Sequence, residues 1–159
     1  RDSRLTPWLR PQPLIQSGDP RLRAAAHQIL ADESDPARAA ARLTHWVAAH
    51  VRKEATVGPQ NAVRVLVQQR GDCNEFTVLY VALARAAGLP ARSVAGLLEA
   101  GGRFYYHAWP EVYLGSWVAV DPVLDQFPAD AAHLRFIVGG LARQAQLIRF
   151  LGRLKVEGL

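Results

Sequence analysis

The chain has 159 residues, half of them hydrophobic and 21% charged, which is typical of a single globular domain large enough to bury a core. Its net charge of +5 comes from basic residues that are scattered rather than clustered, and this pattern argues against nucleic-acid binding. No apolar run of about 18 residues is present, and the single cysteine, Cys73, excludes an internal disulfide and a multi-cysteine zinc site.

Residues 1–20 are rich in proline, which predicts an extended lead-in or linker before a folded domain at 21–159. The sequence starts at Arg1 and not at a methionine. We therefore expect it to be a fragment of a longer protein, with one or more further domains upstream.

Helices are predicted in the first half of the chain. Residues 21–31 favour a short alanine-rich helix, and Asp35, directly before a proline, is a strong N-cap for the next one. Trp46 belongs to the apolar stripe of that second helix, so we expect it to be buried. Residues 61–69 predict a third helix, with Val67 among its inward-facing residues.

Cys73 begins the longest apolar helix, which Gly88 and Pro90 bring to an end. Beyond it the hydrophobic period changes from helical to alternating, which predicts strands. The strands are expected at 91–100, 103–114 and 116–124, followed by a strand at 134–140, a helix at 141–150 and a final strand at 153–158. Helices followed by antiparallel strands define an α+β domain.

A thiol in the first turn of a helix is favoured as thiolate by the helix dipole, which predicts a lowered pKa for Cys73. The alternative is a small core residue. A thiol nucleophile needs a histidine as its base, and that histidine needs a carboxylate to orient it. His107 lies in the middle of a predicted strand, one strand before Asp121, whereas His133 falls in a predicted loop.

The apolar residues of the two strands indicate which faces their polar residues occupy. If the apolar even-numbered positions face the core, then His107 and Asp121 share the other face, together with Trp109 and Trp117. This register requires an odd-length connection, such as a three-residue turn with Gly115 at positive φ. We expect the two tryptophans to line a substrate cleft. Taken singly, His107 could be a hydrogen-bonded sheet residue and Asp121 a turn cap.

The segments GDCNEFTVLYVALARAAGLPARSVAGL and YYHAWPEVYLGSWVAVDP resemble the bacterial branch of the transglutaminase-like superfamily of papain-type thiol enzymes. The resemblance implies a papain-like/transglutaminase-core fold, in which N-terminal helices, with the nucleophile at a helix start, pack on an antiparallel sheet. Cys73, His107 and Asp121 match the family's nucleophile, base and orienting carboxylate. Pro110 departs from the family pattern, and we expect it where no neighbouring strand needs its N–H.

Residues and resemblance together suggest cysteine-dependent acyl transfer on peptide or glutamine amides by residues 21–159, through a thioester. Hydrolysis is preferred, amine transfer or deamidation is second, and a catalytically silent peptide-binding module is third. We expect a peptide or protein substrate and no metal or organic cofactor. The resemblance favours an extracytoplasmic bacterial setting. The Cys73 N–H is one candidate oxyanion donor, and Gln60 or the Trp109 indole could be the other.

Overall fold

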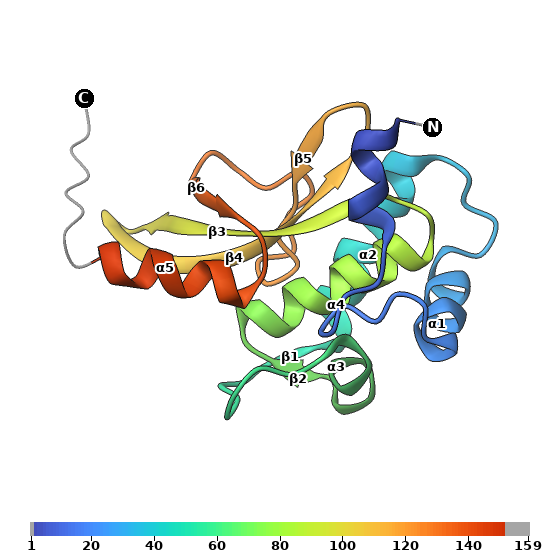
Figure 1. The fold of residues 1–159 in the computed structure, drawn as a ribbon, viewed down its shortest axis with the longest axis horizontal. Coiled ribbons are helices and arrows are strands. Elements are labelled where there is room, and N and C mark those ends of the chain that lie inside the picture. Colours follow the sequence, from blue (N-terminus) through green and yellow to red (C-terminus); the bar gives the residue numbers. More distant parts are fainter. Residues whose placement is uncertain (1, 152–159) are drawn as a thin grey trace.

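The computed structural model describes residues 2–151 (Figure 1). A four-stranded sheet has helices α1 to α4 gathered on one side, and α5 packs near one end of it (Figure 1). The elements are η1 (Ser3–Leu9), α1 (Pro20–Leu30), α2 (Pro36–His50), β1 (Arg52–Lys53), α3 (Ala62–Gln68), β2 (Arg70–Gly71), α4 (Cys73–Ala86), β3 (Ala91–Ala100), β4 (Arg103–Tyr113), β5 (Trp117–Ala119), β6 (His133–Val138) and α5 (Leu141–Leu151). In this part of the chain, no helix is both long and apolar enough to cross a membrane.

The N-terminal segment differs from the extended lead-in that its prolines predicted. Residues Ser3–Leu9 form a 3₁₀ helix, and the Asp2 carboxylate caps it by accepting the Arg4 N–H at 3.0 Å. The Trp8 ring then meets Trp117 of β5 edge-on, with centroids 5.9 Å apart. The segment is therefore folded against the edge of the sheet.

The main sheet has the strand order β5-β4-β3-β6, and every neighbouring pair in it is antiparallel. The α+β fold class is thereby confirmed, with N-terminal helices and with Cys73 as the first residue of α4. The short parallel pair of β1 and β2 was not anticipated from the sequence. The strand expected at 153–158 lies outside the described residues.

Helix α4 forms the centre of the core, because its residues from Glu75 to Arg85 are all buried. Two burial predictions were wrong. Trp46 is only partly buried, because its ring stacks on His50 at the outer end of α2, with centroids 4.3 Å apart. Val67 is 68% exposed, because α3 turns Val65 to the core instead.

Val65 and Val67 offer a matched pair for measuring core burial, since they are the same residue type in the same helix. Val65→Ala should lower the free energy of unfolding by about 2 kcal/mol through the loss of buried methyl groups. Val67→Ala should change it by no more than about 0.5 kcal/mol, since alanine favours a helix and little buried area is lost. Urea unfolding curves measure both, and equal costs would contradict the assignment of the buried face.

Candidate active site

Local hydrogen bonds place Cys73 at the start of α4. The Asp72 side chain caps the helix by accepting the Asn74 N–H at 2.8 Å, and Glu75 reaches back to accept the Asp72 N–H at 3.0 Å, which completes a capping box. The same Glu75 carboxylate accepts the Thr56 hydroxyl at 3.1 Å and the Gln60 N–H at 3.3 Å. One side chain therefore fixes both the helix start and the loop beside it.

Cys73 lies at an edge of β4 that β5 leaves open. Only residues 111–113 of β4 pair with β5. One further hydrogen bond, from the Val120 N–H to the Pro110 carbonyl at 3.0 Å, extends this pairing by one residue. Backbone groups two residues apart on a strand point to the same side. The N–H of Ala108 therefore points to the same side as the Pro110 carbonyl, but beyond the end of β5, where it is directed at the Cys73 sulfur. Pro110 itself lies opposite Ser93 of β3 and accepts the Val120 N–H on its other side, so the expectation that it has no paired neighbour was wrong.

The thiol packs against Ala95 and Ala108, whose side chains face the helices. His107 is the neighbour of Ala108 and points to the opposite face of the sheet. Cys73 therefore contacts β4 at its edge and does not lie on the face that carries the histidine.

The prediction of a lowered pKa for Cys73 was wrong. Burial raises the pKa of this thiol to about 11, and the carboxylates of Asp72, Glu75 and Asp121 add to the effect. The Ala108 N–H works in the other direction but is outweighed. Removal of the thiol from water thus has a larger effect on the pKa of Cys73 than the dipole of α4.

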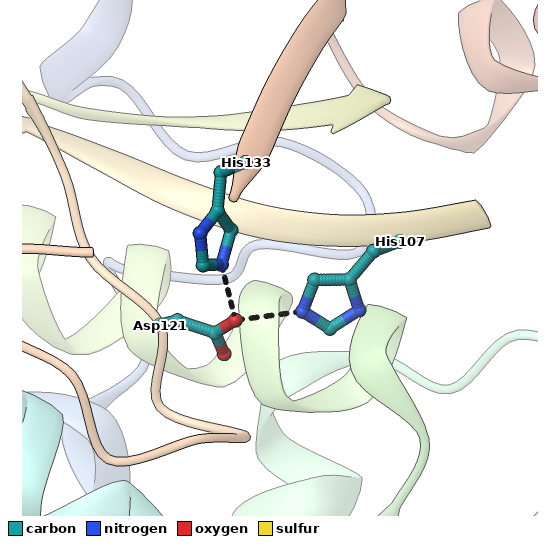
Figure 2. Close-up of side chains that lie close together, drawn as sticks. All are labelled: His107, Asp121 and His133. Atoms are coloured by element: carbon teal, nitrogen blue, oxygen red, sulfur yellow. Dashed lines mark hydrogen bonds and ion pairs between the residues drawn. The ribbon is translucent and has the colours of Figure 1, made fainter. Parts of the chain in front are cut away.

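The register predicted for the hairpin is confirmed. Glu111 lies opposite Ala119 and Tyr113 opposite Trp117, so odd-numbered residues pair with odd-numbered ones across a three-residue connection. Gly115 in that connection has a φ of +93°. His107 and Asp121 consequently meet, and His107 Nε2 lies 2.7 Å from Asp121 Oδ2 (Figure 2).

Asp121 is fully buried, and its two oxygens have different partners. Oδ1 accepts the backbone N–H groups of Val123 and Leu124 at 2.8 and 3.2 Å, and Oδ2 faces His107 and His133. Burial alone would raise the pKa of this carboxyl, but the bonds to both histidines outweigh burial and hold the pKa well below its usual range. The group is therefore a carboxylate at neutral pH.

His133 is a site residue that the sequence did not single out. Its Nε2 lies 2.7 Å from Asp121 Oδ2, the same oxygen that His107 contacts (Figure 2). It reaches the site because β6 approaches β3 very closely at Gly96, where a Cβ atom would lie 1.9 Å from the Leu134 carbonyl oxygen. The facing side-chain atoms of His107, Asp121 and His133 all lie within 4.8 Å of one another.

The structure does not support the two tryptophans as walls of an open cleft. Trp109 is on the predicted face but is 1% exposed, because its ring packs against His107 and His133 with centroids 5.9 and 5.1 Å away. Trp117 lies opposite Tyr113, six residues along β4 from His107, or about 20 Å at the rise of a strand. It packs there against Trp8 and Arg92.

Each of the two candidate oxyanion donors has a buried polar atom without a hydrogen-bond partner among the described residues, Oε1 in Gln60 and Nε1 in Trp109. Gln60 belongs to the loop that Glu75 anchors beside Cys73. Tyr106, also missed from the sequence, packs with Cys73, and its hydroxyl donates to Gln144 of α5 at 2.6 Å. Helix α5 is thereby joined to the strand that carries His107.

A helix that starts with a cysteine and packs on an antiparallel sheet bearing a buried His–Asp pair is the arrangement of papain-type thiol enzymes. The family model described as "Transglutaminase-like superfamily" matches residues 23–122, and the chain belongs to this superfamily. The resemblance noted in the sequence is thereby confirmed.

Two curated relatives are similar in sequence. One is a protein-glutamine gamma-glutamyltransferase from Pseudomonas aeruginosa, 31% identical over 132 residues, which are 72% of this chain and 20% of the relative. The other is an uncharacterized Haemophilus influenzae protein, 30% identical over 95 residues, which are 57% of this chain and 26% of the relative. The chain thus spans about a quarter or less of these relatives' length.

Solved structures show the same fold. A protein from Cytophaga hutchinsonii described as a candidate cysteine protease superposes with a TM-score of 0.79 at 24% identity, covering 91% of this chain and 50% of that one. The periplasmic domain of TgpA from Pseudomonas aeruginosa gives a TM-score of 0.62 at 24% identity, covering 79% of this chain and 49% of that one.

The raised pKa of Cys73 can be tested by alkylation. With His107 replaced by Asn, iodoacetamide labelling should be slow at neutral pH and should rise only well above the free-cysteine pKa of about 8.5, because burial disfavours the thiolate and no imidazole assists its formation. Mass spectrometry of samples quenched between pH 6 and 11 measures the rate. A midpoint at or below the free-cysteine value of about 8.5 would contradict the dominance of burial.

Proposed function

We propose that this domain is a thiol enzyme that transfers acyl groups from peptide or glutamine amides, with Cys73 as nucleophile, His107 as base and Asp121 as orienting carboxylate. The observation that carries the proposal is the hydrogen bond of 2.7 Å between His107 Nε2 and the buried Asp121. It commits Nε2 to the carboxylate and leaves Nδ1 as the nitrogen available for proton transfer.

In the proposed reaction, Cys73 Sγ attacks the amide carbonyl carbon while its proton passes to His107 Nδ1. The carbonyl oxygen takes up the electron pair, and the tetrahedral adduct collapses as His107 returns the proton to the departing amine. A thioester remains on Cys73. Because the pKa of the resting thiol is raised to about 11, the sulfur attacks while its proton moves to His107. Attack by a thiolate formed beforehand is not part of the proposal.

The thioester can react with water or with an amine, and these two reactions define two candidate functions. Water would give hydrolysis, as a protease or amidase, which is the outcome that the family resemblance favours. An amine would instead take the glutamine acyl group from Cys73 and form a new amide, and this candidate is supported by the 31% identical relative described as a protein-glutamine gamma-glutamyltransferase. A peptide-binding module without turnover is the remaining alternative.

One assay separates these outcomes. The protein is mixed with a glutamine-containing peptide and a fluorescent amine, and the products are resolved by mass spectrometry. Cleaved peptide or free acid indicates hydrolysis, and a fluorescent adduct indicates transfer. Cys73→Ala should abolish either product, because no other thiol is present in the sequence. Product formation at the wild-type rate by that variant, or no product from the wild-type protein over a panel of peptides, would count against the proposal.

Asp121→Asn tests the orienting role of the carboxylate. Turnover should fall by about 10³- to 10⁴-fold, because the amide can favour the wrong imidazole tautomer of His107. Oδ1 and Oδ2 both accept N–H groups in the folded protein, so the amide leaves donors unpaired and the melting temperature should fall as well. Rates are therefore normalised to the folded fraction measured by circular dichroism, and a normalised rate equal to that of wild type would remove Asp121 from the mechanism.

A further inference from the structure

His133 is held as tightly as the proposed catalytic pair. It begins β6 opposite Leu98 of β3, and its side chain is 2% exposed. Its Nε2 bonds to the same oxygen of Asp121 that His107 uses, at the same distance of 2.7 Å (Figure 2). The Trp109 ring packs against both imidazoles, so neither can swing away freely.

The two histidines differ at their second nitrogen. His133 Nδ1 lies 3.0 Å from the Asp130 carboxylate and 3.1 Å from the Asp130 carbonyl oxygen. Both partners only accept hydrogen bonds, as does the ionised Asp121 at Nε2, so both nitrogens of His133 must carry protons. For His107 the hydrogen bonds described for residues 2–151 include none at Nδ1.

The two imidazoles therefore differ in their hydrogen bonds: His133 is bonded at both ring nitrogens, whereas His107 is bonded at Nε2. Asp121 and Asp130 face His133 from the loop that joins β5 to β6, and His107 of β4 faces it across Asp121 with ring centroids 5.9 Å apart. Two carboxylates and one proton-exchanging imidazole therefore surround the His133 ring. The surroundings stabilise its charged form.

We propose that His133 is a positioning residue, a buried imidazolium that fixes the Asp121 carboxylate and so keeps His107 Nε2–H bonded and His107 Nδ1 free to accept the Cys73 proton. The proposal rests on the proposed function and adds a fourth residue to it. His133 acts only through Asp121 and has no direct contact with the reacting atoms.

Electrostatics agree with this geometry. Burial works to lower the pKa of His133, but the hydrogen bond and charge of Asp121 and the bonds to Asp130 outweigh burial and raise the pKa. Because the pKa of His133 is higher in the folded than in the unfolded protein, its protonation stabilises the fold. This stabilisation is complete below the unfolded-state pKa of about 6.5 and is lost as the pH rises through the folded-state pKa. The positioning effect should therefore weaken at alkaline pH.

The experiment compares four variants with wild type. His133→Gln keeps a donor toward Asp121 but not the charge, and His133→Leu removes both. His107→Asn removes the proposed base. His45→Gln is the matched control, because His45 also pairs with a carboxylate of the same loop, Asp125, but is exposed and contacts neither Asp121 nor His107.

Two readouts are independent of any substrate. The first is the rate of Cys73 alkylation by iodoacetamide from pH 6 to 9. The second is the set of histidine ¹⁵N chemical shifts, with the His133 signals assigned from their absence in His133→Gln. Melting temperatures verify that each variant is folded, and His133→Gln keeps the test open if His133→Leu does not fold.

At pH 6, His133→Leu should slow alkylation about tenfold or more, because a charge-assisted hydrogen bond to Asp121 is lost. For His133→Gln, the ratio of wild-type to variant rate should be largest at pH 6 and should shrink as the pH rises through the raised pKa of His133, because wild type then loses the charge as well. Both His133 nitrogens should be protonated at pH 6, and His45→Gln should match wild type throughout.

The possible failures are distinguishable. If His107→Asn slows alkylation but both His133 variants match wild type, or if His133 is neutral at pH 6, the positioning role is wrong and the proposed function stands. If His107→Asn alkylates like wild type at every pH, the proposed function fails and the positioning role fails with it.

Discussion

The buried carboxylate of Asp121 is the constraint around which the candidate site is arranged. An ionised carboxylate removed from water requires a full set of donors, and Asp121 obtains them from three parts of the chain: its own turn, β4 and β6. Each donor fixes something else in turn. The backbone N–H groups shape the turn after β5, His107 is held in one orientation, and the start of β6 is held against the sheet.

Cys73, the proposed nucleophile, is placed by a second and separate set of interactions. Glu75 is buried and accepts hydrogen bonds from the helix start and from the loop before α3, so Cys73 cannot shift without disturbing both. The termination of β5 at Ala119 leaves room for Cys73 beside Ala108. The two halves of the site meet at the edge of β4, which carries His107 on one face and contacts Cys73 from the side.

Residues 73, 107 and 121 could be brought together from the sequence because each has a local signal. Cys73 follows an N-cap, His107 lies on β4, and Asp121 follows β5, and the alternating apolar residues of these two strands indicate both the face and the odd-length turn. His133 has no such signal. Its contact with Asp121 depends on a bulge in the pairing of β6 with β3 and on the path of the intervening loop, which are long-range features.

Predictions of exposure failed where tertiary structure covers or uncovers a face. The alternation placed Trp109 on the correct face, but His107 and His133 pack over its ring there. The helix dipole at Cys73 was a sound local argument, yet the pKa depends on how much water the folded protein removes from the thiol, and that is set by contacts with β3 and β4. Burial is a property of the assembled fold, so neighbouring residues in the sequence are insufficient to predict it.

The raised pKa of Cys73 has a consequence for the protein's resistance to oxidants. Peroxides react with thiolates, and a thiol with a pKa of about 11 is ionised in only about one molecule in 10,000 at pH 7. A sulfur held in this way is slow to form sulfenic acid while the site is at rest, although it is the group on which turnover would depend. The surroundings that suppress the free thiolate therefore also protect this sulfur from oxidants.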